Sequence, residues 1–481
     1  MIGRRKLVVN SLSIFVNRLT QSITTFVLVA AIARMRGPYE LGQYLLAFSY
    51  YFVFMTLAAQ GFKVLFTREV SRHPLETPVY LVSGTLLQFL FSIIGYVVLV
   101  IVVFVLPYSP DTSTVCYILG LTIIPFSLSN VTEAIFQAQE RLYLMSISVV
   151  PVYLLRVVLM IWAMTLSYGI SFLSGIMVIS ETLILLIEWG LMVRTVQPKW
   201  QINWDFIWRT VKSARTLLAI EGVAVINGRM QFLILSLLGG EVVVGLYGGV
   251  VQLTQPFQII SNSLVGATFP RMAKAVELGR EEQRYLVETI LEILLLVALP
   301  IIVGLFFLGG DLLLFIYQNP SFAEATVALN VVALTLIGTS FTQPLSYLLV
   351  ANGVEWVNLR EVVITAILGS LIAVVLVSQY QLLGAAIALL FTSISGCSQY
   401  IYSVYARLFT LQLWRIIRRP LLISIAMLTV FAILRNVTQD FLRTLITASF
   451  AYTLLVSLIG VYALGGPGVV WAKLLRKEQG S

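Results

Sequence analysis

Charged side chains stand inside long apolar stretches of this sequence, where an ionisable group is costly and marks a functional site by default. Arg18, Arg156 and Arg229 lie within such stretches, and Lys63 closes another. An arginine stays protonated and presents a planar fork of donors that fits phosphate oxygens. These residues therefore predict an anion site, and a phosphate or pyrophosphate is the ligand that suits it best.

Carboxylates and amides accompany these cations in the apolar stretches. Glu133 and Glu221 are candidates for carrying a coupling proton, and Glu181 and Glu188 share one further apolar stretch. The alternative interpretation is that the acids pair internally and pin helices together, and that Lys63 extends to the membrane surface. The polar side chains that we expect in the same cavity are Gln21, Asn130, Asn227, Gln252 and Gln255.

The composition indicates what must hold these residues in place. Of 481 residues, 59% are hydrophobic and 11% are charged, whereas a soluble globular chain carries roughly 25% charged residues. The chain is therefore predicted to be an integral membrane protein. Its two cysteines, Cys116 and Cys397, are far apart and favour no disulfide framework. We predict neither a metal site nor a cofactor.

The apolar stretches predict an all-α polytopic membrane protein with about fourteen spans. Alternating strands of ~10 residues, which a membrane β-barrel would need, are not found, and helices are the other structure that can cross a bilayer. The basic and then apolar beginning is interpreted as a retained first span. The predicted spans are 8–33, 40–61, 79–106, 113–136, 143–167, 169–193, 214–238, 242–268, 285–308, 322–350, 357–378, 382–406, 420–437 and 443–465.

The positions of Lys and Arg predict the direction of the spans. With both termini in the cytoplasm, most basic residues fall on the cytoplasmic side, which is the positive-inside pattern. The net charge of +9 is then a topology signal and requires no nucleic-acid partner. The outer connections hold only Arg34, Arg36, Arg435 and Arg443.

Two short segments of the chain repeat. "GPYELGQY" at 37–44 matches "GEVVVGLY" at 240–247, and we expect all four glycines to serve turns between spans. A weaker match joins "FQAQERLYL" at 136–144 to "LVANGVEWVNL" at 349–359. Since six spans separate the copies, both halves have the same orientation, which is typical of transporters that rock one half against the other. The predicted parts are an N-lobe at 1–200, a C-lobe at 201–410, and helices 13 and 14 with a tail at 411–481.

Three longer passages resemble a known family. "NSLSIFVNRLTQSITTFVLVAAIARMRGPYELGQYLLAFS", "GEVVVGLYGGVVQLTQPFQIISNSLVGATFPRMAKA" and "YQLLGAAIALLFTSI" are similar to polysaccharide-repeat flippases of the Wzx type. These belong to the MOP superfamily, with the MATE drug exporters and the lipid II flippase. The resemblance covers the first twelve spans, and it implies two six-helix lobes around a central cavity. Helices 13 and 14 depart from the twelve spans of many members and occur also in the lipid II flippase.

The resemblance also implies a substrate and a path. The substrate would be an undecaprenyl-pyrophosphate-linked oligosaccharide, moved from the cytoplasmic to the periplasmic leaflet of the bacterial inner membrane for surface polysaccharide biosynthesis. Arg18 and Arg229 match the cationic cavity residues of the family best and would hold the pyrophosphate, with Arg156 and Lys63 nearby. The cavity amides would contact sugar hydroxyls. A monomer is expected, with a polysaccharide polymerase and glycosyltransferases as functional partners.

Three alternatives stay open. A cation-coupled drug exporter of the MATE type needs cavity carboxylates, which Glu133 and Glu221 could supply. A lipid II flippase for peptidoglycan shares the cationic cavity and the fourteen spans. A membrane polymerase or ligase would need a catalytic constellation on a large outer loop, but the outer loops are short and the single histidine, His73, is cytoplasmic. We therefore predict a transporter rather than an enzyme.

Overall fold

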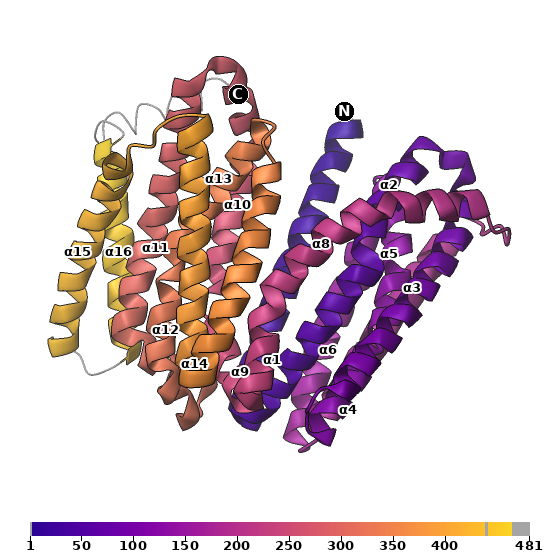
Figure 1. The fold of residues 1–481 in the computed structure, drawn as a ribbon, viewed down its shortest axis with the longest axis horizontal. Coiled ribbons are helices and arrows are strands. Elements are labelled where there is room, and N and C mark those ends of the chain that lie inside the picture. Colours follow the sequence, from indigo (N-terminus) through magenta and orange to yellow (C-terminus); the bar gives the residue numbers. More distant parts are fainter. Residues whose placement is uncertain (1, 438–440, 464–481) are drawn as a thin grey trace. The chain divides into compact units, whose positions relative to one another are not determined.

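The computed structural model describes residues 2–437 and 441–463, and within these ranges the regular structure is helical, with no β-strand (Figure 1). The prediction of an all-α membrane fold is thus confirmed. The chain forms two compact units. Unit 1 holds residues 1–252, 316–322 and 362–388, and unit 2 holds 253–315, 323–361 and 389–481. The lobe boundaries expected from the sequence differ from this division by contact and stay a prediction.

Unit 1 is a bundle in which α1 packs against α4, α6, α8 and α9, while α5 packs against α2, α3 and α7. A five-residue π-helix, Thr56–Gln60, joins α1 to α2. The helices are α1 Ile2–Met55, α2 Gly61–Arg72, α3 Thr77–Val105, α4 Pro110–Gly120, α5 Ile123–Ala138, α6 Leu142–Thr165, α7 Ile170–Val193, α8 Trp204–Leu238 and α9 Gly240–Gln252.

Unit 2 holds the later helices, among which α10 packs on α13, α12 on α13, and α15 on α16. Helix α14 contributes its middle, 362–388, to unit 1. The helices are α10 Gln255–Leu278, α11 Arg280–Tyr317, α12 Thr326–Ala333, α13 Thr335–Ala351, α14 Trp356–Arg407, α15 Leu413–Val437 and α16 Phe441–Ala463.

Ten helical segments of the described chain are long and apolar enough to cross a membrane. Two of them each correspond to two predicted spans. Trp356–Arg407 contains 357–378 and 382–406, and Leu12–Arg72 contains 40–61 and most of 8–33. The predicted span 242–268 is divided between α9 and α10, and Pro256 lies in the first turn of α10. The final predicted span, 443–465, ends two residues beyond the described part.

The repeated glycines have two different roles. Gly37 and Gly240 occupy equivalent positions and adopt positive φ angles of 81° and 77°. Such angles are open to glycine because it has no Cβ. Gly37 breaks α1 into two helical parts, and Gly240 follows the end of α8. These two glycines serve the turns that the sequence predicts.

The other repeated pair, Gly42 and Gly245, lies inside helices, so our expectation of a turn at these positions was wrong. A Cβ added at Gly42 would overlap the carbonyl oxygen of Glu241, and one at Gly245 would overlap that of Pro38. The two contacts are reciprocal, since Pro38 and Glu241 are also equivalent positions of the repeat. The absent side chains therefore let the backbones of α1 and α9 touch.

The weaker repeat corresponds to a matched pair of helix ends. Helix α5 ends at Ala138 and α13 ends at Ala351, two equivalent positions. Two residues later Glu140 and Gly353 take positive φ angles of 55° and 71°. After each, a backbone amide returns to a carbonyl five residues back, at 2.8 Å for α5 and 2.9 Å for α13. This is the Schellman type of helix termination, and it gives the sequence match a structural basis.

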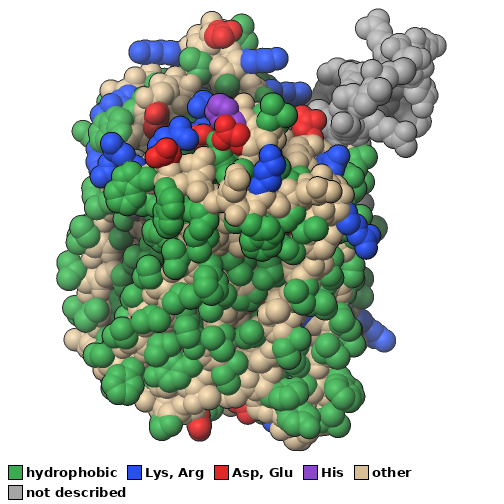
Figure 2. Space-filling model, turned by 90° about the vertical axis from the view of Figure 1, so that its right-hand side faces the viewer, with side chains coloured by type: hydrophobic (Ala, Val, Ile, Leu, Met, Phe, Trp, Pro, Cys, Tyr) green, Lys and Arg blue, Asp and Glu red, His purple; other side chains and the backbone are tan. Residues whose placement is uncertain are grey.

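The outer surface of unit 1 is apolar in the way that a bilayer requires. On α3, Phe104 and Val105 are 79% and 74% exposed. Figure 2 shows hydrophobic side chains over the middle of this face and charged side chains gathered at one end. A large exposed apolar band of this kind matches the predicted spans, because lipid and not water faces it.

The contact between α1 and α9 predicts a position-specific sensitivity to size. Gly42→Ala or Gly245→Ala should force the two backbones apart and destabilise the protein by about 1–3 kcal/mol. Chemical unfolding in detergent, followed by circular dichroism, measures this change. Gly175→Ala in α7 is the control, because no atom lies within 4 Å of its added Cβ. Equal stability of all three variants would contradict the prediction.

Candidate functional site

A cation and an acid meet where α2 packs on α5. The Lys63 ammonium group forms an ion pair with the Glu133 carboxylate, and the two side chains are 23% and 11% exposed. Lys63 is therefore bound to an acid rather than extending freely to the membrane surface. The pairing that we left open as an alternative is confirmed here.

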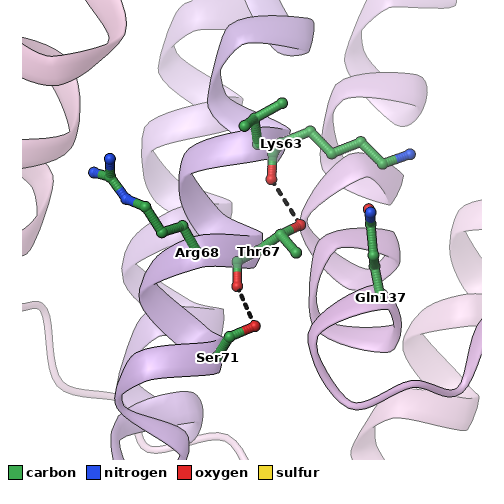
Figure 3. Close-up of a pocket in the computed structure, with 6 residues that line it drawn as sticks. Lys63, Thr67, Arg68, Ser71 and Gln137 are labelled. Atoms are coloured by element: carbon green, nitrogen blue, oxygen red, sulfur yellow. Dashed lines mark hydrogen bonds between the residues drawn. The ribbon is translucent and has the colours of Figure 1, made fainter. Parts of the chain in front are cut away.

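An open cavity of about 260 Å³ adjoins this pair, lined by residues of α2 and by Gln137 of α5. Figure 3 shows the Lys63 side chain reaching toward the helix that carries Gln137, while Arg68 points to the other side of α2. The hydroxyls of Thr67 and Ser71 are bonded to backbone carbonyls one turn back, at 2.9 and 2.7 Å. Lys63 is thus the cation that faces the acid-bearing side of this cavity.

A second ion pair lies deeper, between α6 and α7. The Arg156 guanidinium binds the Glu181 carboxylate, and the side chains are only 11% and 4% exposed. The same guanidinium carbon lies 4.3 Å from the centre of the Tyr153 ring. Internal pairing is thus the observed state of Arg156, and an incoming anion would have to compete with Glu181. A role for Arg156 in substrate binding stays a prediction.

Arg229 of α8 differs from Lys63 and Arg156 in having aromatic rings rather than a carboxylate as its partner. Its guanidinium carbon lies 4.7 Å from the ring centre of Phe52 and 5.6 Å from that of Phe48, both on α1. Within residues 2–437 and 441–463, no ion pair or side-chain hydrogen bond to Arg229 is found. The side chain is partly buried. Arg229 is therefore a cation held by aromatic faces with its donors uncommitted.

The aromatic side of this site is not among the residues predicted from the sequence. Tyr44, Phe48 and Phe52 follow one another at intervals of four residues, which places them on one face of a helix. Their rings stack in turn, with centres 6.1 and 6.2 Å apart. That spacing was the available signal, but apolar periodicity in a membrane span usually indicates packing alone.

The remaining predicted residues lie in varied surroundings. Arg18, Gln21 and Glu221 are exposed, and the described structure gives their side chains no bonded partner. Asn227 and Gln252 are partly buried in unit 1, and Gln255 is exposed in unit 2. Asn130 is buried, and its amide nitrogen has no hydrogen-bond partner. The structure thus joins Lys63 to Glu133 and leaves the wider site a prediction.

Comparison with known proteins places this geometry in a family context. Residues 7–276 match the family model described as polysaccharide biosynthesis protein. No curated protein matches the sequence significantly. A lipid II flippase MurJ in an inward closed conformation is similar in structure with a TM-score of 0.75 at 16% identity, over 95% of this chain and 99% of that one.

Other transporters share the fold at lower similarity. An inward-facing multidrug resistance MATE family transporter of the MOP superfamily gives a TM-score of 0.64 at 14% identity, over 80% of this chain and 95% of that one. A MOP superfamily transporter from Pyrococcus furiosus gives 0.58 at 13% identity, over 83% and 95%. At these identities the likeness establishes the fold, and that fold is the one expected from the sequence.

The buried pair of Arg156 and Glu181 yields a test by substitution. Arg156→Met should destabilise the protein by about 3–5 kcal/mol, because it leaves the Glu181 charge buried without a partner. The double change Arg156→Met with Glu181→Met should recover most of this loss. Unfolding in detergent measures both. Arg68→Gln serves as the control, since its pair with Glu69 is exposed and should be worth less than about 1 kcal/mol.

Proposed function

From the family of polysaccharide biosynthesis proteins, to which the chain belongs, and from its MOP-superfamily fold, we propose that it is a flippase for a polyprenyl-pyrophosphate-linked oligosaccharide. It moves this lipid from the cytoplasmic to the periplasmic leaflet of the bacterial inner membrane. Both termini lie in the cytoplasm. The product would serve surface polysaccharide synthesis, and glycosyltransferases and a polymerase would act before and after it.

The state of Arg229 is the observation that carries this proposal. The rings of Phe48 and Phe52 hold its guanidinium group. A guanidinium so held keeps its N–H edge for a second ligand, and paired N–H donors fit the oxygens of a phosphate. A drug exporter that binds cations would instead require an uncommitted carboxylate in this position. The pyrophosphate of the lipid-linked sugar therefore suits Arg229.

Lys63 and Arg18 would complete the binding of the headgroup. Lys63 lines the open cavity but is bound to Glu133, so the phosphate must take over from that carboxylate. Arg18 has no bonded partner in the described structure and is available to a ligand. The polar side chains Gln21, Asn130, Asn227 and Gln252 of unit 1 would contact the sugar hydroxyls, while the polyprenyl tail stays in lipid.

The parts of α1 and α9 that follow Gly37 and Gly240 would act as a gate in alternating access. Next to the glycine contact, the Thr112 hydroxyl donates to Glu241 at 2.7 Å and accepts from the Gln43 amide at 3.0 Å. In the connection before α4, the Tyr108 hydroxyl lies 2.8 Å from those of Tyr50 and Ser236. These bonds join segments that belong to different halves of the repeat. Their rupture would open the path to the periplasm.

The proposal predicts a loss of transport on removal of one guanidinium group. Arg229→Gln should abolish or strongly reduce export of the lipid-linked oligosaccharide. A hydrogen bond to a charged group is worth about 1.5–3 kcal/mol, which corresponds to roughly 10- to 150-fold in affinity. Surface polysaccharide in a strain that depends on this chain reports export, and binding of the lipid-linked substrate to purified protein reports affinity.

Arg209→Gln is the matched control, since Arg209 lies exposed on the same helix. Double replacement of Arg18 and Arg229 by Ala should remove any residual binding. Normal export by both the single and the double variants, at normal insertion, would refute the anion site. Equal binding of lipid II would transfer the proposal to peptidoglycan synthesis.

A further inference from the structure

Glu188 of α7 is a buried acid that the transport path does not use. The residue is 0% exposed and lies five residues before the end of α7. Its two carboxyl oxygens contact hydroxyls of two other helices, at 2.8 Å from Thr132 of α5 and 3.0 Å from Ser148 of α6. Glu188 thus sits in a closed cage of hydroxyl groups.

The hydroxyl groups of this cage can accommodate a neutral carboxyl group, because each also has an acceptor in its own helix. The Thr132 hydroxyl also lies 2.7 Å from the Ser129 carbonyl, and the Ser148 hydroxyl lies 2.9 Å from the Met145 carbonyl. The Ser148 hydroxyl lies 3.2 Å from the Leu144 carbonyl as well. Each hydroxyl has one proton, so with Glu188 ionised two protons would face five acceptor oxygens. A protonated Glu188 can donate a hydrogen bond to one of the hydroxyls. That hydroxyl can then donate its own proton to the carbonyl of its helix.

The charged groups nearest Glu188 are paired with one another. In the described part of the chain no cation is bonded to Glu188, and a buried carboxylate without such a partner is costly. Glu133 of α5 and Lys63 of α2 act on Glu188 electrostatically, but they are paired to each other. On the α6 side, Arg156 is occupied by Glu181.

A polar path leads from the Lys63 cavity toward Glu188. Gln137 lines the cavity, and Glu133 and Asn130 follow on the same face of α5 at intervals of four and three residues. The Asn130 amide nitrogen and the Ser129 hydroxyl are buried without hydrogen-bond partners. Buried polar atoms in this state are usually satisfied by internal water. Water along α5 would connect the cavity with the cage.

We propose that Glu188 is a proton-binding site that controls whether Lys63 is available to an anionic ligand. The proton passes from water in the cavity to a carboxyl oxygen of Glu188 and returns to water on release, and no other bond changes. An ionised Glu188 adds a second negative charge near Lys63 and strengthens its retention by the acids. A neutral Glu188 leaves Lys63 held by Glu133 alone.

The control of Lys63 by Glu188 rests on the proposed function, in which the anion at Lys63 is the pyrophosphate of the substrate. Proton binding at Glu188 and anion binding at Lys63 then favour each other, as linkage requires. The affinity for the anion should fall as pH rises, by at most about tenfold per pH unit for one linked proton. The Glu188→Gln change keeps the site neutral and should make the affinity independent of pH.

Two measurements test the proposal on the full chain in lipid nanodiscs. Infrared difference spectroscopy should detect the C=O band of a protonated carboxyl group in the native protein and not in Glu188→Gln. Binding of undecaprenyl pyrophosphate should weaken with rising pH in the native protein and stay tight in Glu188→Gln. Glu281→Gln, whose side chain is 82% exposed, is the control and should match the native protein in both.

The outcomes separate the two ideas. Retention of the protonated band in Glu188→Gln, or the same pH dependence of binding in both proteins, would overturn the inference. Loss of the band with no binding of undecaprenyl pyrophosphate at any pH would refute the proposed function and leave the proton site standing. If Glu188→Gln fails to insert, Ser148→Ala provides the test, because loss of one cage hydroxyl must shift the frequency of the band.

Discussion

The contact of two backbones, where α1 meets α9, is the constraint on which the rest of unit 1 depends. Gly42 and Gly245 leave no room for a side chain, and each faces a carbonyl oxygen of the other helix. With the helices that close, the Thr112 hydroxyl and the Glu241 carboxylate come within hydrogen-bonding distance. Further along α1, the same alignment brings the rings of Phe48 and Phe52 beneath Arg229 of α8. A helix contact set by two glycines thus positions both the proposed gate and a cation.

The ionisable side chains inside the bundle fall into two groups, according to whether each has an oppositely charged partner. Arg156 and Lys63 each have a carboxylate, which lowers the cost of their burial and fixes helices α6 to α7 and α2 to α5. Arg229 has aromatic faces in place of an acid, and Glu188 has hydroxyls in place of a base. Paired groups provide structure, whereas groups with neutral partners keep their capacity for an ion or a proton. This difference separates the candidate site from its framework more clearly than depth in the membrane does.

Much of the fold was predictable, because lipid imposes length and apolar character on every span. The turns at Gly37 and Gly240 and the helix ends at Ala138 and Ala351 followed from the repeat. The pairing of Lys63 with Glu133 did not, since the residues are 70 positions apart and their meeting depends on how α2 packs on α5. Arg229 was recognised from its charge alone, but its aromatic setting required the geometry of two helices that are distant in sequence.

The short π-helix between α1 and α2 has a consequence for register. A π-helix accommodates an extra residue within an otherwise regular helix, and each added residue rotates everything after it by about 100°. Thr56–Gln60 comes immediately before α2, so it determines which face of α2 carries Lys63. A regular α-helix through this stretch would direct Lys63 away from α5. The ion pair and the cavity beside it both depend on this one-residue irregularity.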